Sequence, residues 1–275
     1  MRAQELHLTS IQNPRIKEVV KLRDKVDRDR LHQFIIEGYR ELLRAVDAQH
    51  PISSLFISPS LFLGVNEGAL IERLRYQGTK IFNCDPAVFK KISYRDRPDG
   101  LLGVAPQQER TFKDLEKIFL KKKAPLFVVA EAIEKPGNLG TILRSADAVG
   151  VDAMIVCDRC TDIHNPNVIR SSVGTFFTVP VIEAEGKETR KWLKQHGVLI
   201  AAATPHADKE FTEVEMTKPL AIVVGTEQIG LSEAWMKEAT LQVKIPMCGV
   251  ADSLNVAMAT TLLLYEALRQ RRLER

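Results

Sequence analysis

The second half of the chain contains four short runs in which apolar and polar residues do not alternate. They are LFVVAEAI (126–133), AMIVC (153–157), VLIAAA (198–203) and LAIVVG (220–225). A strand with one face in water alternates, so strands that are apolar throughout belong to a sheet covered on both faces. Stretches typical of helices separate these runs, and a long one covers 253–272. The pattern predicts an α/β domain over residues 125–275.

The first half shows a smaller α/β pattern. Its expected strands are FIIEG (34–38), LFIS (55–58), KIFNC (80–84) and GLLGVA (100–105), with helices over 39–49, 69–78 and 87–93. Residues 14–30 carry an apolar stripe at helical spacing. Strands that alternate with helices in this way predict an α/β sandwich over residues 1–105. The charged stretch 106–124 is interpreted as a linker with a connecting helix.

The two halves differ in charge. Residues 1–123 carry 23 Lys and Arg against 16 Asp and Glu, a net of +7, whereas residues 124–275 carry 16 against 19, a net of −3. A basic part next to a nearly neutral part favours contact with a polyanion, although ordinary surface variation produces such differences too. No apolar run is long enough for a transmembrane helix and the N-terminus does not resemble a secretory signal. Four cysteines give no disulfide framework, so a cytoplasmic location is expected.

Familiar nucleotide and metal motifs do not occur. The stretch from Gly137 to Gly140 lacks the first glycine pair of the GxGxxG fingerprint, and there is no GxxxxGK[ST] loop. Cys157 and Cys160 form a lone CxxC, without the second ligand pair of a structural zinc site. We interpret them as two ordinary cysteines at a strand end, and we expect no metal.

Three polar segments each follow the carboxyl end of an expected strand, where ligands bind in open α/β sheets. In the first, Asn138 is expected to open a helix and Arg144 lies on an otherwise small and apolar helical stretch. The ordinary roles for these residues are an N-cap and a surface charge. In the second, Gly225 ends a strand, where a glycine lets the backbone approach a ligand closely, and Glu227 follows.

The third segment runs from Ile245 through Pro246 into the final helix, which is apolar on all sides and is therefore expected to be buried. Ser253 and Asn255 at its start are expected to be buried polar groups that need partners. Capping the helix is the ordinary alternative, and it suits Ser253 better than Asn255.

Together the three segments resemble the motifs of the SpoU (TrmH) family of RNA ribose methyltransferases in the SPOUT superfamily. The resemblance rests on NLGTILRSADAVG (138–150), GTEQIGLS (225–232) and IPMCGVADSLNVA (245–257). Gln228 departs from the family, which commonly has glycine there. The N-terminal SIQNPRIK (10–17) and FIIEG (34–38) resemble the L30e-like RNA-binding domain that often precedes the family's catalytic domain.

The resemblance implies a C-terminal trefoil-knot domain, a homodimer with the final helix at the interface, and S-adenosylmethionine as cofactor. Carried over by position, the residues expected to line the cofactor are Gly225, Ile245 and Leu254. The expected polar catalytic set is Asn138, Arg144, Glu227, Ser253 and Asn255. The implied substrate is a ribose 2′-hydroxyl in RNA, with ribosomal RNA the first choice because of the front domain and transfer RNA the second.

The chemistry indicates a role for Arg144. A ribose hydroxyl is a weakly acidic nucleophile that must be held close to the methyl carbon. An arginine can hold the neighbouring phosphate and stabilise the developing negative charge, but it stays protonated and is no general base. Asn138, Ser253 and Asn255 are expected to orient the ribose and Arg144, and Glu227 to hold Arg144 or its loop. A non-catalytic RNA-binding protein and a methyltransferase for a base or small molecule remain alternatives.

Overall fold

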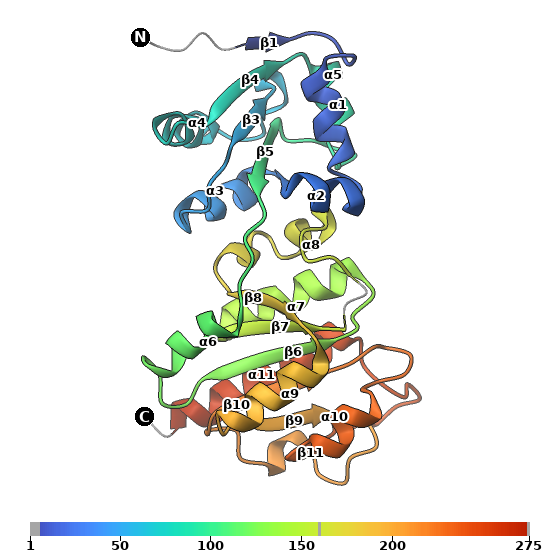
Figure 1. The fold of residues 1–275 in the computed structure, drawn as a ribbon. Coiled ribbons are helices and arrows are strands. Elements are labelled where there is room, and N and C mark those ends of the chain that lie inside the picture. The colour runs from blue at the N-terminus through green and yellow to red at the C-terminus, as the bar shows by residue number, and fades with distance from the viewer. Residues whose placement is uncertain (1–5, 159–160, 274–275) are drawn as a thin grey trace. The chain divides into compact units, whose positions relative to one another are not determined.

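The computed structural model describes residues 6–158 and 161–273 (Figure 1). The chain forms two compact units. Residues up to Gln108 together with Asp162–Thr178 form the first unit, and Glu109–Thr161 together with Val179–Arg275 form the second. No helix within the described ranges is long and apolar enough to cross a membrane.

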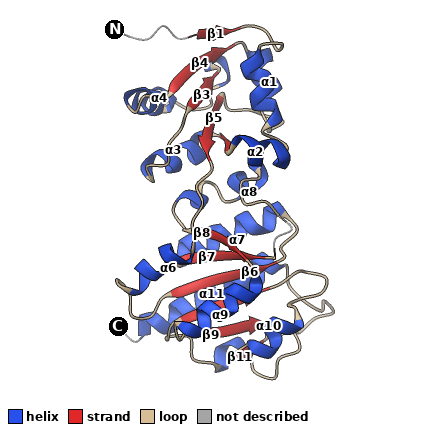
Figure 2. Cartoon of the chain, in the orientation of Figure 1, coloured by secondary structure: helices blue, strands red, loops and turns tan. Residues whose placement is uncertain are grey.

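The first unit contains a five-stranded mixed sheet with the strand order β1-β4-β3-β5-β2 (Figure 2). Strands β1, β4 and β3 are parallel, and β5 runs antiparallel to both of its neighbours. Its strands are β1 (Leu6–Leu8), β2 (Gln33–Glu37), β3 (Ser54–Ile57), β4 (Lys80–Cys84) and β5 (Leu101–Pro106). Its helices are α1 (Pro14–Lys21), α2 (Lys25–Leu31), α3 (Tyr39–Asp47), α4 (Glu67–Tyr76), α5 (Pro86–Ile92) and α8 (Pro166–Ser171), with 3₁₀ turns η1 (Pro59–Leu61) and η2 (Thr175–Phe177).

The apolar stripe of residues 14–30 forms two helices rather than one. Asn13 caps α1 by accepting a hydrogen bond from the backbone N–H of Arg15, and the fixed φ of Pro14 suits the first helical position. The chain leaves the helical conformation at Asp24, and α2 then turns the Arg28 side chain into the protein interior. The buried side chains of α1 and α5 pack against β3 and β4 on one face of the sheet.

The second unit contains a six-stranded sheet with the order β11-β9-β10-β6-β7-β8, in which every printed pair is parallel. Its strands are β6 (Leu126–Glu131), β7 (Ala153–Cys157), β8 (Val181–Ala184), β9 (Leu199–Ala203), β10 (Leu220–Val224) and β11 (Leu241–Val243). Its helices are α6 (Phe112–Phe119), α7 (Pro136–Val149), α9 (Gly186–Gln195), α10 (Glu233–Glu238) and α11 (Val256–Leu273), with the 3₁₀ turn η3 (Phe211–Glu213). All residues of β6, β7 and β10 are buried, so the predicted sheet covered on both faces is confirmed.

Helices cover both faces of this sheet. Leu115 of α6, Trp192 of α9 and Trp235 of α10 pack on one face, and α7 and α11 pack together on the other, where α11 also contacts β10. From β6 the chain continues to β7 on one side, whereas from β10 it continues to β11 on the other. The boundary between β6 and β10 is therefore the point where the strand order reverses, and ligands bind at the carboxyl ends of the strands at such a point.

The segment Asp162–Thr178 lies within the range 125–275 that the sequence assigns to one domain, yet it packs with the first unit. Figure 1 shows its helix α8, in yellow, among the elements of that unit. The rings of His164, Phe176 and Phe177 surround Phe34 of β2, with centroids 4.8, 6.1 and 6.3 Å away. Arg28 and Asp162 form a buried ion pair at 2.6 Å. Apolar burial and this ion pair account for the association.

Candidate active site in the second unit

Helix α7 begins two residues earlier than Asn138. Its first residue is Pro136, which suits the start of a helix because the proline lacks an N–H that would be unpaired there. Asn138 is thus the third residue of the helix and not the N-cap. Its side-chain N–H donates instead to Glu227 Oε1 at 3.1 Å. The helix ends at Gly150 in the left-handed conformation, which glycine adopts without strain.

The loop after β10 is held by its own backbone. Thr226 and Gly230 exchange two hydrogen bonds of 3.1 and 3.0 Å. A Cβ on Gly225 would lie 2.2 Å from the carbonyl oxygen of Gly230. The loop itself therefore requires a glycine at this position, which adds a second reason to the one expected from the sequence. Gln228 has no positive φ, so this position does not require the glycine common in the family.

Helix α11 begins at Val256, three residues later than expected. Asn255 is its capping residue, since its Oδ1 accepts the backbone N–H of Ala257 at 3.0 Å. Ser253 lies in the preceding loop, and both Ser253 and Asn255 are exposed. The expectation that they are buried and that Ser253 suits capping better is wrong, because the loop delays the helix start.

Glu227 joins the three segments. Its Oε1 accepts from the Asn255 side chain at 2.6 Å as well as from Asn138, and Asn255 also donates to Asn138 Oδ1 at 3.2 Å. Lys135, which sequence reasoning missed, donates to Glu227 Oε2 at 2.5 Å. In the sequence, Lys135 could have been noticed only as a basic residue between the end of β6 and the start of α7. We call Lys135, Asn138, Glu227 and Asn255 the polar network.

The charges of the polar network are fixed by this pairing. The hydrogen bond from Lys135 is the main cause that lowers the pKa of Glu227 below its ordinary value, and the same bond raises the pKa of Lys135. Glu227 is consequently ionised and Lys135 protonated near neutral pH. The lowered pKa makes Glu227 a weaker proton acceptor, and the raised pKa makes Lys135 a weaker proton donor, than the free side chains.

Arg144 and Ser253 do not belong to the polar network. Arg144 is exposed on α7, and within the described residues it has no hydrogen bond or ion pair. Glu227 was expected to hold either Arg144 or its own loop. Its contacts with Lys135 and the two asparagines fit the second of these roles. The next residue, Ser145, hydrogen-bonds Thr261 of α11 at 2.6 Å. The guanidinium of Arg144 thus projects from a helix that is anchored to α11.

The residues expected to line the cofactor lie around the same loops. Gly225 directly follows β10, and Ile245 and Leu254, both half-buried, lie at the two ends of the connection from β11 to α11. Ile229 is 86% exposed and Val250 fully exposed. A Cβ on Gly230 or Gly249 would meet no atom within 4 Å. Open backbone and exposed apolar side chains suit S-adenosylmethionine, which combines an apolar adenine with polar groups.

Of the two cysteines in the CxxC stretch, the structure describes Cys157. Cys157 is buried, its thiol donates to Thr189 Oγ1 at 3.2 Å, and burial raises its pKa to about 12. Such a thiol is unreactive, because the thiolate is the reactive form. Cys160 lies outside the described residues.

The polar network lies at the carboxyl ends of β6 and β10, where the strand order of an α/β sheet reverses. Comparison with known proteins gives the family. The chain belongs to the SpoU rRNA methylase family, which matches residues 125–265, and an MRM3-like substrate binding domain matches residues 13–103. The family and the α/β fold class predicted from the sequence are confirmed, as is an RNA methyltransferase.

Relatives match over nearly the whole chain. The 23S rRNA (uridine(2479)-2'-O)-methyltransferase of Streptomyces viridochromogenes is 30% identical over 89% of this chain and 85% of its own length. The crystal structure of an RNA 2'-O ribose methyltransferase is 40% identical, with a TM-score of 0.83 over 97% of this chain and all of that chain. An AdoMet-bound rRNA methyltransferase from Sinorhizobium meliloti is 28% identical, with a TM-score of 0.87 over 97% and 98% of the two chains.

Proposed function

We propose that this protein transfers a methyl group from S-adenosylmethionine to a ribose 2′-hydroxyl of ribosomal RNA. The polar network carries the proposal. It joins the segments after β6, after β10 and before α11 through Glu227, at the point where the strand order reverses. The ribosomal substrate is supported by the names of relatives that match most of the chain.

The roles follow from charge and exposure. When bound, S-adenosylmethionine would supply a methyl group activated by its sulfonium and leave as the neutral thioether S-adenosylhomocysteine, and the proton of the 2′-hydroxyl would pass to solvent at this exposed site. Arg144 holds the phosphate next to the reacting ribose and stabilises negative charge at the 2′-oxygen, because its exposed guanidinium has no partner among the described residues. Asn138 and Asn255 orient the ribose, with Glu227 fixing both amides, and Ser253 contacts the RNA from the loop before α11. Gly225, Ile245 and Leu254 contact the cofactor.

The domain roles and assembly are part of the proposal. Residues 1–105, with which 162–178 pack, bind the RNA. Residues 106–124 connect and add α6 to the second unit, and the rest of 125–275 forms the knotted methyltransferase domain of a cytoplasmic protein. The protein is a homodimer joined through α11, on which Met258, Leu262 and Tyr265 form an exposed apolar face at helical spacing. Leu262→Asp is expected to give monomers in light scattering, because it places a charge in that face. A variant that remains dimeric contradicts this interface.

Methylation mapping tests the activity. Ribose 2′-O-methylation is mapped across total RNA from cells with and without the protein, and purified protein is then assayed on the identified RNA. One ribose that loses its methyl group without the protein, and regains it in vitro with S-adenosylmethionine, is the expected result. RNA methylated beforehand at that 2′-oxygen must accept no further methyl group. Methyl transfer to such RNA indicates base chemistry and contradicts the proposal.

A further inference from the structure

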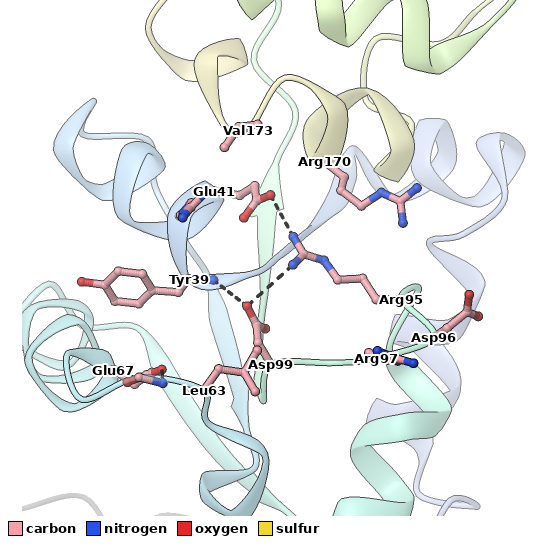
Figure 3. Close-up of a pocket in the computed structure, with 12 residues that line it drawn as sticks. Tyr39, Glu41, Leu63, Glu67, Arg95, Asp96, Arg97, Asp99, Arg170 and Val173 are labelled. Atoms are coloured by element: carbon pink, nitrogen blue, oxygen red, sulfur yellow. Dashed lines mark hydrogen bonds and ion pairs between the residues drawn. The ribbon is translucent and has the colours of Figure 1, made fainter.

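The first unit holds a cluster of charged side chains by pairing them with one another. Figure 3 shows Arg95 between Glu41 and Asp99 in a cleft of about 780 Å³, whose lining contains four arginines and four carboxylates. Arg144 of the second unit has no such support, because no hydrogen bond or ion pair joins its side chain to the other described residues. Its position at a substrate must therefore be set by the helix that carries it.

Helix α7, which carries Arg144, is joined by hydrogen bonds at two levels to α11 and its capping residue. At the first level, the Asn255 side-chain N–H donates to Asn138 Oδ1 at 3.2 Å. At the second level, the hydroxyl oxygens of Ser145 and Thr261 lie 2.6 Å apart. The two residues of α7 are separated by two helical turns, so they face the same neighbour about 10 Å apart along the helix axis. Two bridges at this spacing fix both the sliding and the rotation of one helix against the other.

The second bridge is connected to the polar network through the first turn of α11. The Thr261 hydroxyl donates to the carbonyl oxygen of Ala257 at 2.7 Å, so its proton is used and its oxygen accepts the proton of Ser145. The backbone N–H of Ala257 donates in turn to Asn255 Oδ1 at 3.0 Å. The side-chain N–H of Asn255 then donates to Glu227 Oε1 at 2.6 Å. A continuous chain of hydrogen bonds therefore leads from Ser145 on α7 to the carboxylate of the polar network.

The bond between Ser145 and Thr261 is not needed to satisfy either hydroxyl. Both side chains are half-buried, and each hydroxyl has an acceptor in its own helix, the carbonyl oxygen of Thr141 at 3.3 Å for Ser145 and that of Ala257 for Thr261. Removal of one hydroxyl thus leaves the other with a partner, and the loss of stability should be small. What the bond adds is a fixed register between α7 and α11.

We propose that Ser145 and Thr261 are positioning residues for methyl transfer, because their hydrogen bond holds α7 in the register that places Arg144 at the reacting ribose. Arg144 precedes Ser145 directly and lies about 100° from it around the helix, so any slide or rotation of α7 moves its guanidinium. A misplacement of about 1 Å by a change outside the reacting atoms can lower a rate by roughly 10²-fold. The inference rests on the proposed function, and it adds two residues that contact neither the RNA nor the cofactor in that proposal.

Single-turnover methylation of the mapped RNA by the full chain tests the positioning role. Ser145→Ala and Thr261→Val are each expected to lower the rate about tenfold, with the affinities for S-adenosylmethionine and RNA changed by less than about twofold. The double variant should also lose about tenfold, because each substitution removes the same bond. A double loss of about a hundredfold means that the two hydroxyls act separately and overturns the proposal, as does a wild-type rate in either single variant.

Two further variants separate register from folding. Ser145→Thr keeps the hydroxyl and is expected to react within about threefold of the wild-type rate. Thr260→Val on α11 is the matched control, because the buried Thr260 hydroxyl donates to the Val256 carbonyl oxygen of its own helix at 2.7 Å. It should react at the wild-type rate, and light scattering should give every variant the oligomeric state of the wild type. A loss in Thr260→Val equal to that in Ser145→Ala, or no recovery in Ser145→Thr, overturns the proposal.

Amide hydrogen exchange measures the bridge without any methylation. In the protein without RNA and cofactor, Ser145→Ala is expected to speed exchange about threefold in the facing turns of α7 and α11, since fewer contacts oppose their local opening. Thr260→Val should leave exchange in α7 unchanged. Unaltered exchange in Ser145→Ala overturns the register role. If the wild-type protein methylates no RNA, the proposed function fails, and this measurement still decides whether the bridge holds the two helices.

Discussion

The two units use charged side chains in opposite ways. In the first unit Arg28 and Asp162 are 1% and 8% exposed, and Arg28 also donates to two backbone carbonyl oxygens. In the second unit the polar network lies at the surface, where Glu227 and Asn255 are exposed. A buried pair is costly to break, whereas exposed pairs contribute little to stability. The first arrangement should therefore control folding and the second activity.

Removal of Arg28 is expected to have the largest effect on stability. Arg28→Ala leaves the Asp162 carboxylate buried without its partner, which costs roughly 3–5 kcal/mol. Urea unfolding of the full chain measures the loss. Arg30→Ala in the same helix is the control, since the Arg30 pair with Asp27 is exposed and its removal should change stability by less than about 0.5 kcal/mol. Similar losses in the free energy of unfolding for the two variants would show that the buried ion pair contributes no more to stability than the exposed one.

Arg144→Ala is expected to lower methyl transfer by roughly 10²-fold or more with almost no loss of stability. The exposed guanidinium supports no other described group, so the loss arises only when the RNA reacts. Single-turnover methylation, with cofactor affinity measured in parallel, gives the effect. Arg144→Lys keeps the charge but loses the planar fork, and should recover only part of the activity.

Lys191→Ala on α9 is the control for Arg144, because it removes an exposed charge on the opposite face of the sheet. It should methylate RNA at the wild-type rate. Wild-type turnover in Arg144→Ala would take Arg144 out of the active site.

The stability of the first unit should fall at mildly acidic pH because of His164. Burial is the main cause that lowers its pKa to about 4, with Asp162 opposing and Arg28 adding to the shift. The folded pKa is below the unfolded value of 6.5, so stability is lost as pH falls through 6.5 toward 4. Between pH 8 and pH 5 the loss is about 2 kcal/mol.

His164→Phe isolates this effect. The variant retains an aromatic ring beside Phe34 and Phe176 but cannot titrate. Burial raises the pKa of Glu37 and Glu41, which shifts stability with pH in the opposite direction, but both proteins contain these residues. Urea unfolding of the two proteins across this pH range should therefore differ by the contribution of His164. Parallel pH curves would contradict it.

The smallest expected effect is that of Lys135→Ala. Removal of the hydrogen bond from Lys135 lets the pKa of Glu227 rise toward its ordinary value, so the carboxylate becomes protonated at a higher pH. The acidic limb of the methylation profile should shift to higher pH, with stability changed by less than about 0.5 kcal/mol. Lys187→Ala, an exposed lysine on α9, should leave the profile in place. A profile that does not move shows that Glu227 ionisation is irrelevant to activity.

The sequence predicted best what depends on local pattern. The unbroken apolar runs at 126–131 and 220–224 identified buried strands, because every residue of such strands is covered. The exact helix starts were missed at Pro136 and Val256, where a proline and a loop displaced them. Lys135 and Glu227 are 92 positions apart, and no local pattern indicates their contact.

Arg28 shows the same limit in the first unit. It belongs to an alternating run of charges that is typical of an exposed helix, yet it is buried. Its burial depends on two nearby backbone carbonyl oxygens and on the charge of Asp162, 134 positions later. Pairing over such separations follows from the tertiary fold and not from periodicity.

Residues 162–178 pack with the first unit although they lie in the second half of the sequence. This arrangement limits which recombinations of the gene give a functional protein. A single recombination event in the 106–124 linker would join a foreign front half to this back half. The incoming Phe34 equivalent would then pack against His164, Phe176 and Phe177 of another lineage, and the residue at position 28 would face a foreign Asp162. Functional chimeras should therefore be those in which residues 162–178 are exchanged together with the front half. This exchange takes two further crossovers, one on each side of the segment.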